Sequence, residues 1–290
     1  MRVFLFRSGK MKNKLRVPCA YQGGKQRVAP QIVEELIEAG SAKSLFYDFC
    51  CGSGAISIEL VNRGIDPSRI VMLDISSWAV FWRAIGAGTF DIQVFDNFLL
   101  EIPSDKRLVK SYMLDLAAQP VGSHEAELYP ILQSASFGGK QIWREESGNK
   151  WVNAFFRDYW EPTPTSVRRS PANPMQPSPD ELRRRVIMLA KQMKGLTCEK
   201  ANILTTLDWE IPDDSVVYID PPYNNTTGYA FKFDIDNFME RFTNIHKTKL
   251  FVSEGKQLSE NATRLVFGGA KGGINGSRIG KHQEWINRFF

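Results

Sequence analysis

The sequence predicts an α/β fold built on a mixed, mainly parallel sheet. Short apolar runs at 45–49, 69–73 and 216–219 are rich in β-branched and aromatic residues, as buried strands are. A helical pattern follows each of the first two runs, and strands that alternate with helices form parallel sheets. Because ligands bind beyond the carboxyl ends of such strands, the residues that follow these runs are candidate site residues.

Composition and charge describe an ordinary globular chain. Of its 290 residues, 43% are hydrophobic and 24% charged, and no apolar stretch reaches the roughly 20 residues that span a bilayer. The N-terminal apolar patch is too short for a signal peptide, so we expect a cytoplasmic protein with no membrane partner. The net charge of +5 favours a polyanionic partner only weakly. Four cysteines and three histidines lack the spacing of a metal site, so no metal is expected.

The first candidate motif, YQGGK, precedes a helical pattern that starts near residue 28. Paired glycines there let backbone amides approach a ligand closely, and Lys25 adds a positive charge beside them. A plain loop before a helix is the alternative interpretation. We take Tyr21, Gly24 and Lys25 as candidate residues.

The second motif runs from the strand at 45–49 into a glycine turn and a helix. Gly52 and Gly54 allow a tight turn over the helix N-terminus, although the third glycine of a dinucleotide site is absent. Asp74 ends the next strand, the usual place for an acid that binds ribose hydroxyls. This order of strand, turn, helix and acid favours an adenosine-like cofactor without a bound pyrophosphate.

The third motif is Asp220-Pro221-Pro222-Tyr223, directly after the apolar run at 216–219. Neither proline can continue a central strand, so Asp220 stands where the strand stops. A carboxylate followed by a stiff turn and a flat ring is suited to holding a planar polar group. The alternative is a purely structural role, in which these residues form a turn that ends the strand and Tyr223 packs in the core.

The alternation of strands and helices is lost between residues 97 and 200, which predicts an insertion. A proline-rich loop at 161–180 leads into a helix that begins at Pro179. Basic, amide and aromatic residues are interleaved in the insertion, as on surfaces for bases and phosphates. The candidate DNA-binding residues are Lys140, Arg144, Lys150, Asn153, Arg168 and Arg169.

The remaining chain, 201–290, is expected to complete the catalytic part. We predict a strand at 201–207 with Asp208 and Trp209 at its end, a strand at 250–254 and a last strand at 285–290. The predicted organisation is therefore a cofactor-binding part at 1–96, an insertion at 97–200 that carries the basic and aromatic residues, and the remainder of the same domain, with the DPPY motif, at 201–290.

Taken together, YQGGK, DFCCGSG, an acid after the second strand and DPPY resemble the Dam-like (D12 class) DNA adenine-N6 methyltransferases. The motifs also occur in that family's order, with the insertion before DPPY. The resemblance implies a Rossmann-like class I S-adenosylmethionine-dependent methyltransferase fold with an inserted target-recognition domain. It also implies double-stranded DNA as substrate, a bacterial or phage-infected cell, and a monomer or weak dimer.

The resemblance assigns roles to residues of this chain. It implies that Tyr21 and Lys25 line the methionine end of the cofactor site, that Asp74 binds the ribose, and that Asp208 accepts from the adenine amino group. The other residues expected at the cofactor are Gly24, Asp48, Gly52, Gly54 and Asp220, and the expected catalytic residues are Asp220, Pro221, Pro222 and Tyr223. Two positions depart from the family: Cys50 stands where phenylalanine is usual, and Tyr21 where tryptophan is frequent.

The implied chemistry is methyl transfer to an adenine amino group. Acceptors at Asp220 and the Pro221 carbonyl would free the nitrogen lone pair, and Tyr223 would stack on the base. A base inside a duplex must be flipped out to reach such a pocket. Cytosine-N4 and RNA adenine methylation stay open as alternatives, although serine is usual at position 220 in the cytosine enzymes. So does a catalytically silent nucleic-acid-binding module of the same fold.

Overall fold

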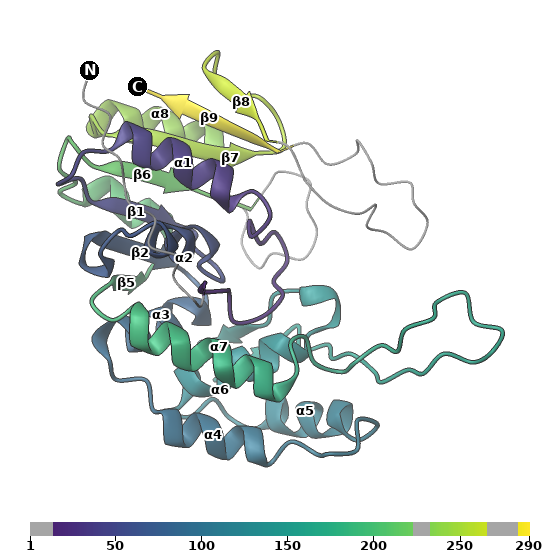
Figure 1. Ribbon diagram of the computed structural model, residues 1–290. Coiled ribbons are helices and arrows are strands. Elements are labelled where there is room, and N and C mark those ends of the chain that lie inside the picture. The colour runs from purple at the N-terminus through teal and green to yellow at the C-terminus, as the bar shows by residue number, and fades with distance from the viewer. Residues whose placement is uncertain (1–13, 223–232, 266–283) are drawn as a thin grey trace.

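A mixed, mainly parallel sheet forms the centre of the protein (Figure 1). The computed structural model describes residues 14–222, 233–265 and 284–290. Within these ranges the sheet has seven strands in the order β5-β2-β1-β6-β7-β9-β8. They are β1 (Phe46–Phe49), β2 (Ile70–Asp74), β5 (Thr197–Lys200), β6 (Val216–Ile219), β7 (Lys249–Glu254), β8 (Ala262–Arg264) and β9 (Trp285–Phe289).

The strand order reverses beside β1. The chain proceeds from β1 to β2 and β5 on one side, whereas β6 and β7 extend the sheet on the other. These five strands are parallel, and β9 runs antiparallel to both β7 and β8. The predicted α/β class with a mixed, mainly parallel sheet is confirmed. The carboxyl ends of β1 and β6 meet at the reversal point, where such sheets bind ligands.

Helices cover both faces of the sheet. On one face Phe46, Val216 and Tyr218 join a core that includes α1 and α2, and on the other Val217 and Ile219 join a core with α8. Alternate residues of each strand therefore enter opposite cores, which explains the continuous apolar runs in the sequence. The helices are α1 (Ala29–Ala39), α2 (Ala55–Asn62), α3 (Ser77–Ala87), α4 (Ile92–Leu100), α5 (Val109–Ala118), α6 (Glu125–Ala135), α7 (Pro179–Gln192), α8 (Ile235–Ile245) and the 3₁₀ turns η1 (Pro67–Arg69), η2 (Phe137–Gly139) and η3 (Ile203–Asp208).

The predicted insertion is largely helical. Helices α6 and α7 pack on α3, α4 and α5 pack on α6, and a two-stranded hairpin of β3 (Trp143–Glu145) and β4 (Lys150–Val152) packs on α5. Residues 159–172, which we call the arm, extend away from this body (Figure 1). Paired backbone hydrogen bonds between Trp160 and Ala172, 3.1 and 2.8 Å long, join the two sides of the arm.

Most predicted elements are present, and one is wrong. The strands near 45–49, 69–73, 216–219, 250–254 and 285–290 are confirmed, as is the helix that begins at Pro179. The strand predicted at 201–207 is wrong: the strand is β5, and residues 203–208 form the 3₁₀ helix η3. The Asn202 side chain accepts a 3.0 Å hydrogen bond from the Leu204 backbone and caps this helix, which ends the extended conformation early.

The ends of the insertion also differ from the expected positions. Helix α4 runs through residue 97, so the chain leaves the sheet earlier, after α3. At the other end β5 lies before residue 200 yet pairs with β2 in the main sheet. In the described ranges, no helix combines the length and the apolar character needed to cross a membrane.

Candidate active site at the carboxyl edge of the sheet

Asp220 lies directly beyond β6, at the reversal point of the strand order. Its backbone N–H donates to the Phe49 carbonyl at 3.2 Å, which continues the pairing of β6 with β1 by one residue. The neighbouring Pro221 is buried and ends the strand because it has no N–H to donate. The side chain of Asp220 is 19% exposed, so its carboxylate is at the margin of the core.

Lys25 reaches this carboxylate from the loop before α1. Its Nζ lies 2.7 Å from Asp220 Oδ1 and 3.7 Å from Glu284 Oε1, and it donates to the Gly23 carbonyl at 3.2 Å. Burial by itself lowers the pKa of Lys25, but the charges of Asp220 and Glu284 outweigh that effect and raise the pKa above its ordinary value. The lysine is therefore cationic at neutral pH, and its ammonium faces the Asp220 carboxyl group at 2.7 Å.

The glycine turn between β1 and α2 needs both of its glycines. Gly52 and Gly54 have φ of +48° and +75°, the left-handed region that favours glycine. A Cβ at Gly54 would lie 2.3 Å from the Trp82 ring, and one at Gly52 would lie 2.8 Å from the Tyr21 ring. The Trp82 indole N–H donates to the Gly52 carbonyl at 3.0 Å and fixes the turn.

Asp74, at the end of β2, holds this turn from the other side. One oxygen accepts from the Gly52 N–H at 2.8 Å, and the other accepts from the Ser76 N–H and hydroxyl at 2.8 and 2.6 Å. A carboxylate has about four acceptor positions, so these bonds leave capacity for one more donor. The structure thus gives Asp74 an internal function, and its role toward a ribose remains a prediction.

Asp48 is buried beneath the turn. Burial raises the pKa of Asp48 from 3.8 to about 7, against two hydrogen bonds from Ser57 that lower it, and the negative charges of Asp220 and Asp74 raise it further. The Ser57 hydroxyl donates to Asp48 Oδ2 at 2.6 Å and its N–H at 3.2 Å. Asp48 therefore ties β1 to α2 and supports the turn from below.

No protein-family model matches this chain, and no curated protein matches its sequence. The site therefore has to be interpreted from its own residues. In the described parts of the chain, no group of three or more His, Cys, Asp or Glu side chains is arranged to hold a metal ion.

Four residues expected at a cofactor lie together, and we call them the glycine wall: Tyr21, Gly52, Gly54 and Asp74. The Tyr21 ring packs against Gly52 and edge-on to Trp78 at 5.8 Å, and Asp74 binds the turn from the opposite side. The wall offers a tight glycine turn, an aromatic ring and a carboxyl group, which suit a sugar and a cationic sulfonium better than a pyrophosphate. These residues fit S-adenosylmethionine.

One expected site residue, Asp208, is not joined to this wall, and another, Tyr223, is not described by the structure. Asp208 ends η3 as an exposed side chain, and among the described residues no hydrogen bond or ion pair connects it to Asp74 or Asp220. Tyr223 lies outside the described residues, so its stacking role stays a prediction. Pro222 directly follows Pro221 and is half-buried.

The candidate DNA-binding residues divide into two groups. Arg144 donates to Glu125 Oε2 at 2.7 Å and to Asn149 Oδ1 at 2.8 Å, and Asn153 donates to the Gln141 carbonyl at 2.6 Å. These two residues stabilise the hairpin of β3 and β4. The others are exposed at the surface: Lys140, Lys150, Arg168 and Arg169.

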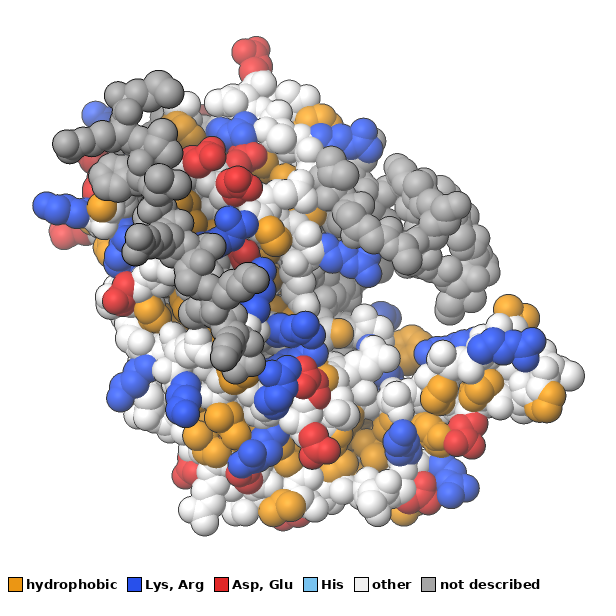
Figure 2. Space-filling view, in the orientation of Figure 1, with side chains coloured by type: hydrophobic (Ala, Val, Ile, Leu, Met, Phe, Trp, Pro, Cys, Tyr) orange, Lys and Arg blue, Asp and Glu red, His pale blue; other side chains and the backbone are white. Residues whose placement is uncertain are grey.

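Arg168 and Arg169 lie in the arm, where their contacts are weak. Arg168 lies over the Trp160 ring at 5.9 Å and donates to the Pro171 carbonyl at 3.3 Å, and Arg169 donates to the Pro164 carbonyl at 3.1 Å. Figure 2 shows basic side chains along this projection. A role in DNA binding remains a prediction for all six residues of the insertion.

Two buried acids beside Lys25 were not anticipated. Glu284 precedes β9, and no local pattern marks it, because only the fold brings it to Lys25. Glu254 ends β7 and is 4% exposed, and its Oε2 has no hydrogen-bond partner among the described residues. An acid at the end of an apolar run is the signal that identified Asp220, and the same signal could have identified Glu254.

Proposed function

We propose that the protein is a site-specific DNA methyltransferase that transfers a methyl group from S-adenosylmethionine to the N6 amino group of adenine. The observation that carries the proposal is the 2.7 Å pair of Lys25 and Asp220 at the carboxyl end of β6. It places a fixed anion, followed by the Pro221 carbonyl, at the point where α/β sheets bind their ligands. The Gly24 N–H donates to the Tyr21 carbonyl at 3.1 Å, which links the glycine wall to the loop of Lys25, and β1, which leads into the glycine turn, pairs with β6.

The residues that would hold the cofactor are those of the wall. Tyr21 would contact its methionine end, the turn at Gly52 and Gly54 would border the cofactor, and the Asp74 carboxylate would accept from ribose hydroxyls. When bound, S-adenosylmethionine supplies a methyl group that its sulfonium already activates. The protein consequently needs accurate positioning of the acceptor nitrogen more than a strong base.

Asp220 and Pro221 would position that nitrogen. An aromatic amino group is a poor nucleophile, because its lone pair is delocalised into the ring. Two acceptors on its N–H bonds favour a geometry in which the lone pair is available. Lys25 supports this role because its ammonium, 2.7 Å from Oδ1, fixes one oxygen of Asp220.

The insertion would deliver the base. Flipping a base out of a duplex costs a few kcal/mol, and contacts between basic residues and phosphates offset that cost. The exposed Lys140, Lys150, Arg168 and Arg169 are candidates for those contacts. Arg144 and Asn153 would act through the shape of the hairpin that they stabilise.

The direct test is transfer of labelled methyl from S-adenosylmethionine to DNA, followed by nucleoside analysis of the product. We expect label in N6-methyladenine from duplex DNA and much less from RNA. Label in N4-methylcytosine or in RNA would replace the proposed substrate. A protein that binds S-adenosylmethionine but transfers no label, beside an active control enzyme, would contradict the proposed activity.

A further inference from the structure

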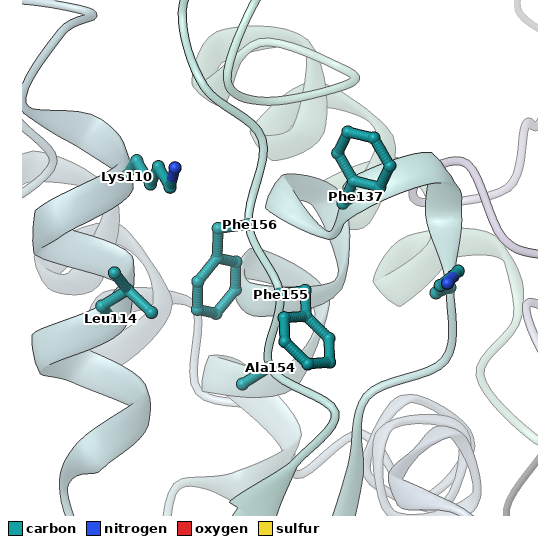
Figure 3. Close-up of a pocket in the computed structure, with 7 residues that line it drawn as sticks. Lys110, Leu114, Phe137, Ala154, Phe155 and Phe156 are labelled. Atoms are coloured by element: carbon teal, nitrogen blue, oxygen red, sulfur yellow. The ribbon is translucent and has the colours of Figure 1, made fainter. Parts of the chain in front are cut away.

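A cavity of about 430 Å³ opens on the insertion. Figure 3 shows Phe137 and Phe155 on one side of it and Lys110 and Leu114 of α5 on the other. Phe137 is 60% exposed and Phe155 65%, unusual values for rings of this size. We call Phe137, Phe155 and Lys140 the aromatic platform.

The platform is held in place by its backbone. The Phe137 N–H donates to the Phe155 carbonyl at 2.7 Å, and the Arg157 N–H donates to the Ala135 carbonyl at 3.0 Å. The Arg157 guanidinium also donates to the Ser136 carbonyl at 3.0 Å. The two rings are therefore presented on fixed segments rather than on a free loop, and a flat ligand would meet preformed faces.

The charge of the cavity is positive. Its only charged lining residues in the described chain are Lys110 and Lys140. Lys110 is paired with Asp158 at 2.6 Å, whereas Lys140 is exposed and makes no ion pair with any described residue. An apolar partner surface would gain nothing from an exposed lysine beside the rings, whereas a base with its phosphate would use both.

The platform is connected directly to the candidate active site. The Gln22 N–H donates to the Gly139 carbonyl at 2.8 Å, and a Cβ at Gly139 would lie 3.3 Å from the Ala20 carbonyl oxygen. Lys25 lies three positions after Gln22, a stretch that spans at most about 11 Å. A single DNA strand bound near Asp220 would therefore continue toward the platform.

We propose that the aromatic platform binds a nucleobase that has left its stack in the DNA, with Lys140 on the adjoining phosphate. This inference rests on the proposed function, since it assumes DNA at the neighbouring site. Stacking of a base on an aromatic ring is tolerant of sequence, so the platform would contribute affinity rather than recognition.

The test uses fluorescence anisotropy with the full chain and two labelled duplexes, one fully paired and one with a single unpaired adenine. The wild type is expected to bind the bulged duplex more tightly. Phe155→Leu keeps an apolar side chain but removes the flat face, and should weaken bulge binding about tenfold. Phe155→Tyr keeps the face and should bind as the wild type does. Lys140→Ala should weaken the binding of both duplexes. The slope of the logarithm of the binding constant against the logarithm of the salt concentration should become shallower by the amount that about one phosphate contact contributes.

Leu100→Ala is the matched control, because Leu100 is 82% exposed on α4 and does not line the cavity. Equal binding of the bulged duplex by wild type, Phe155→Leu and a Phe137→Leu variant would overturn the platform. The platform would also be overturned if the wild type formed dimers and Phe155→Leu abolished them, because the two rings would then contact a second copy of the chain. Methyl transfer by the wild type separates the two proposals. If the wild type transfers methyl groups but the platform variants bind the bulged duplex as the wild type does, only the platform is refuted. If the wild type neither binds DNA nor transfers methyl groups, both proposals are refuted.

Discussion

The carboxyl edge of the sheet and the surface of the insertion use charge in opposite ways. At the sheet edge, Lys25, Asp220 and Glu284 are mostly buried and paired at short distances. On the insertion, Lys150 and the arm arginines are exposed and held by weak contacts. The buried charges of the first region are stabilised by one or two specific partners each. The exposed charges of the second region contribute to a common electrostatic field that salt screens. Substitutions should therefore be severe and independent of salt in the first region, and mild and dependent on salt in the second.

The largest effect is expected for Asp220→Asn. The substitution keeps the shape of the side chain but removes the anion proposed to accept from the amino group. Methyl transfer in single-turnover assays with labelled S-adenosylmethionine should fall by about 10²- to 10³-fold. DNA affinity, measured by anisotropy at several salt concentrations, should stay within about twofold of the wild type. An unchanged transfer rate would remove Asp220 from the mechanism.

The pH dependence of stability should report on Asp48. Burial raises the pKa of Asp48 from 3.8 to about 7, so the folded protein retains a proton that the unfolded chain releases above pH 4. The stability from this group is therefore full below about pH 4 and is lost as the pH rises toward 7. The loss amounts to about 4 kcal/mol at most. Asp48→Asn keeps an acceptor for Ser57 and should flatten this slope in urea unfolding between pH 4.5 and 8.

The control for this prediction is Asp115→Asn on the exposed side of α5. It should leave the slope as it is in the wild type. A wild-type free energy of unfolding that does not fall between pH 4.5 and 7 would show that Asp48 is ionised in the folded protein.

Lys25→Met compares the two regions directly. It leaves Asp220 and Glu284 without their buried cation, which should lower the free energy of unfolding by about 3 kcal/mol. Lys150→Met is the matched change on the insertion, where Lys150 is 62% exposed and pairs with Glu145 at 3.2 Å. It should cost about 0.5 kcal/mol or less. Similar losses in urea unfolding for the two variants would remove the distinction between the regions.

The smallest effects are expected within the insertion itself. Arg169→Ala should weaken DNA binding a few-fold, reduce the salt slope by about one, and leave stability unchanged. Arg144→Ala removes the nearer of the two cations beside the buried Glu125, with Lys200 remaining at 3.7 Å, so it should lower stability by about 2 kcal/mol with little change in the affinity of the folded protein. DNA titrations at three salt concentrations and urea unfolding measure both quantities. If Arg144→Ala instead weakened DNA binding and Arg169→Ala lowered stability, Arg144 would be a DNA contact and Arg169 a structural residue.

The sequence was sufficient to predict features set by local rules. Short apolar runs, the glycines of the turn and the prolines after Asp220 predicted five strands of the main sheet and the turn before α2. Where a local contact competed with the pattern, the prediction was wrong, as at Asn202, whose side chain caps η3 and ends the strand before residue 201. The sequence also did not indicate that α4 continues through the expected domain boundary.

What only the tertiary structure decided is which charges face each other. The sequence by itself determined that Lys25, Asp220 and Asp74 follow or precede regular elements, but not that Lys25 contacts Asp220 and Glu284 or that Arg144 pairs with Glu125. The physical reason is range. Backbone conformation follows from neighbours a few residues apart, whereas these pairs join distant segments and exist only because the parallel strands bring their carboxyl ends to one edge and the insertion packs on α3.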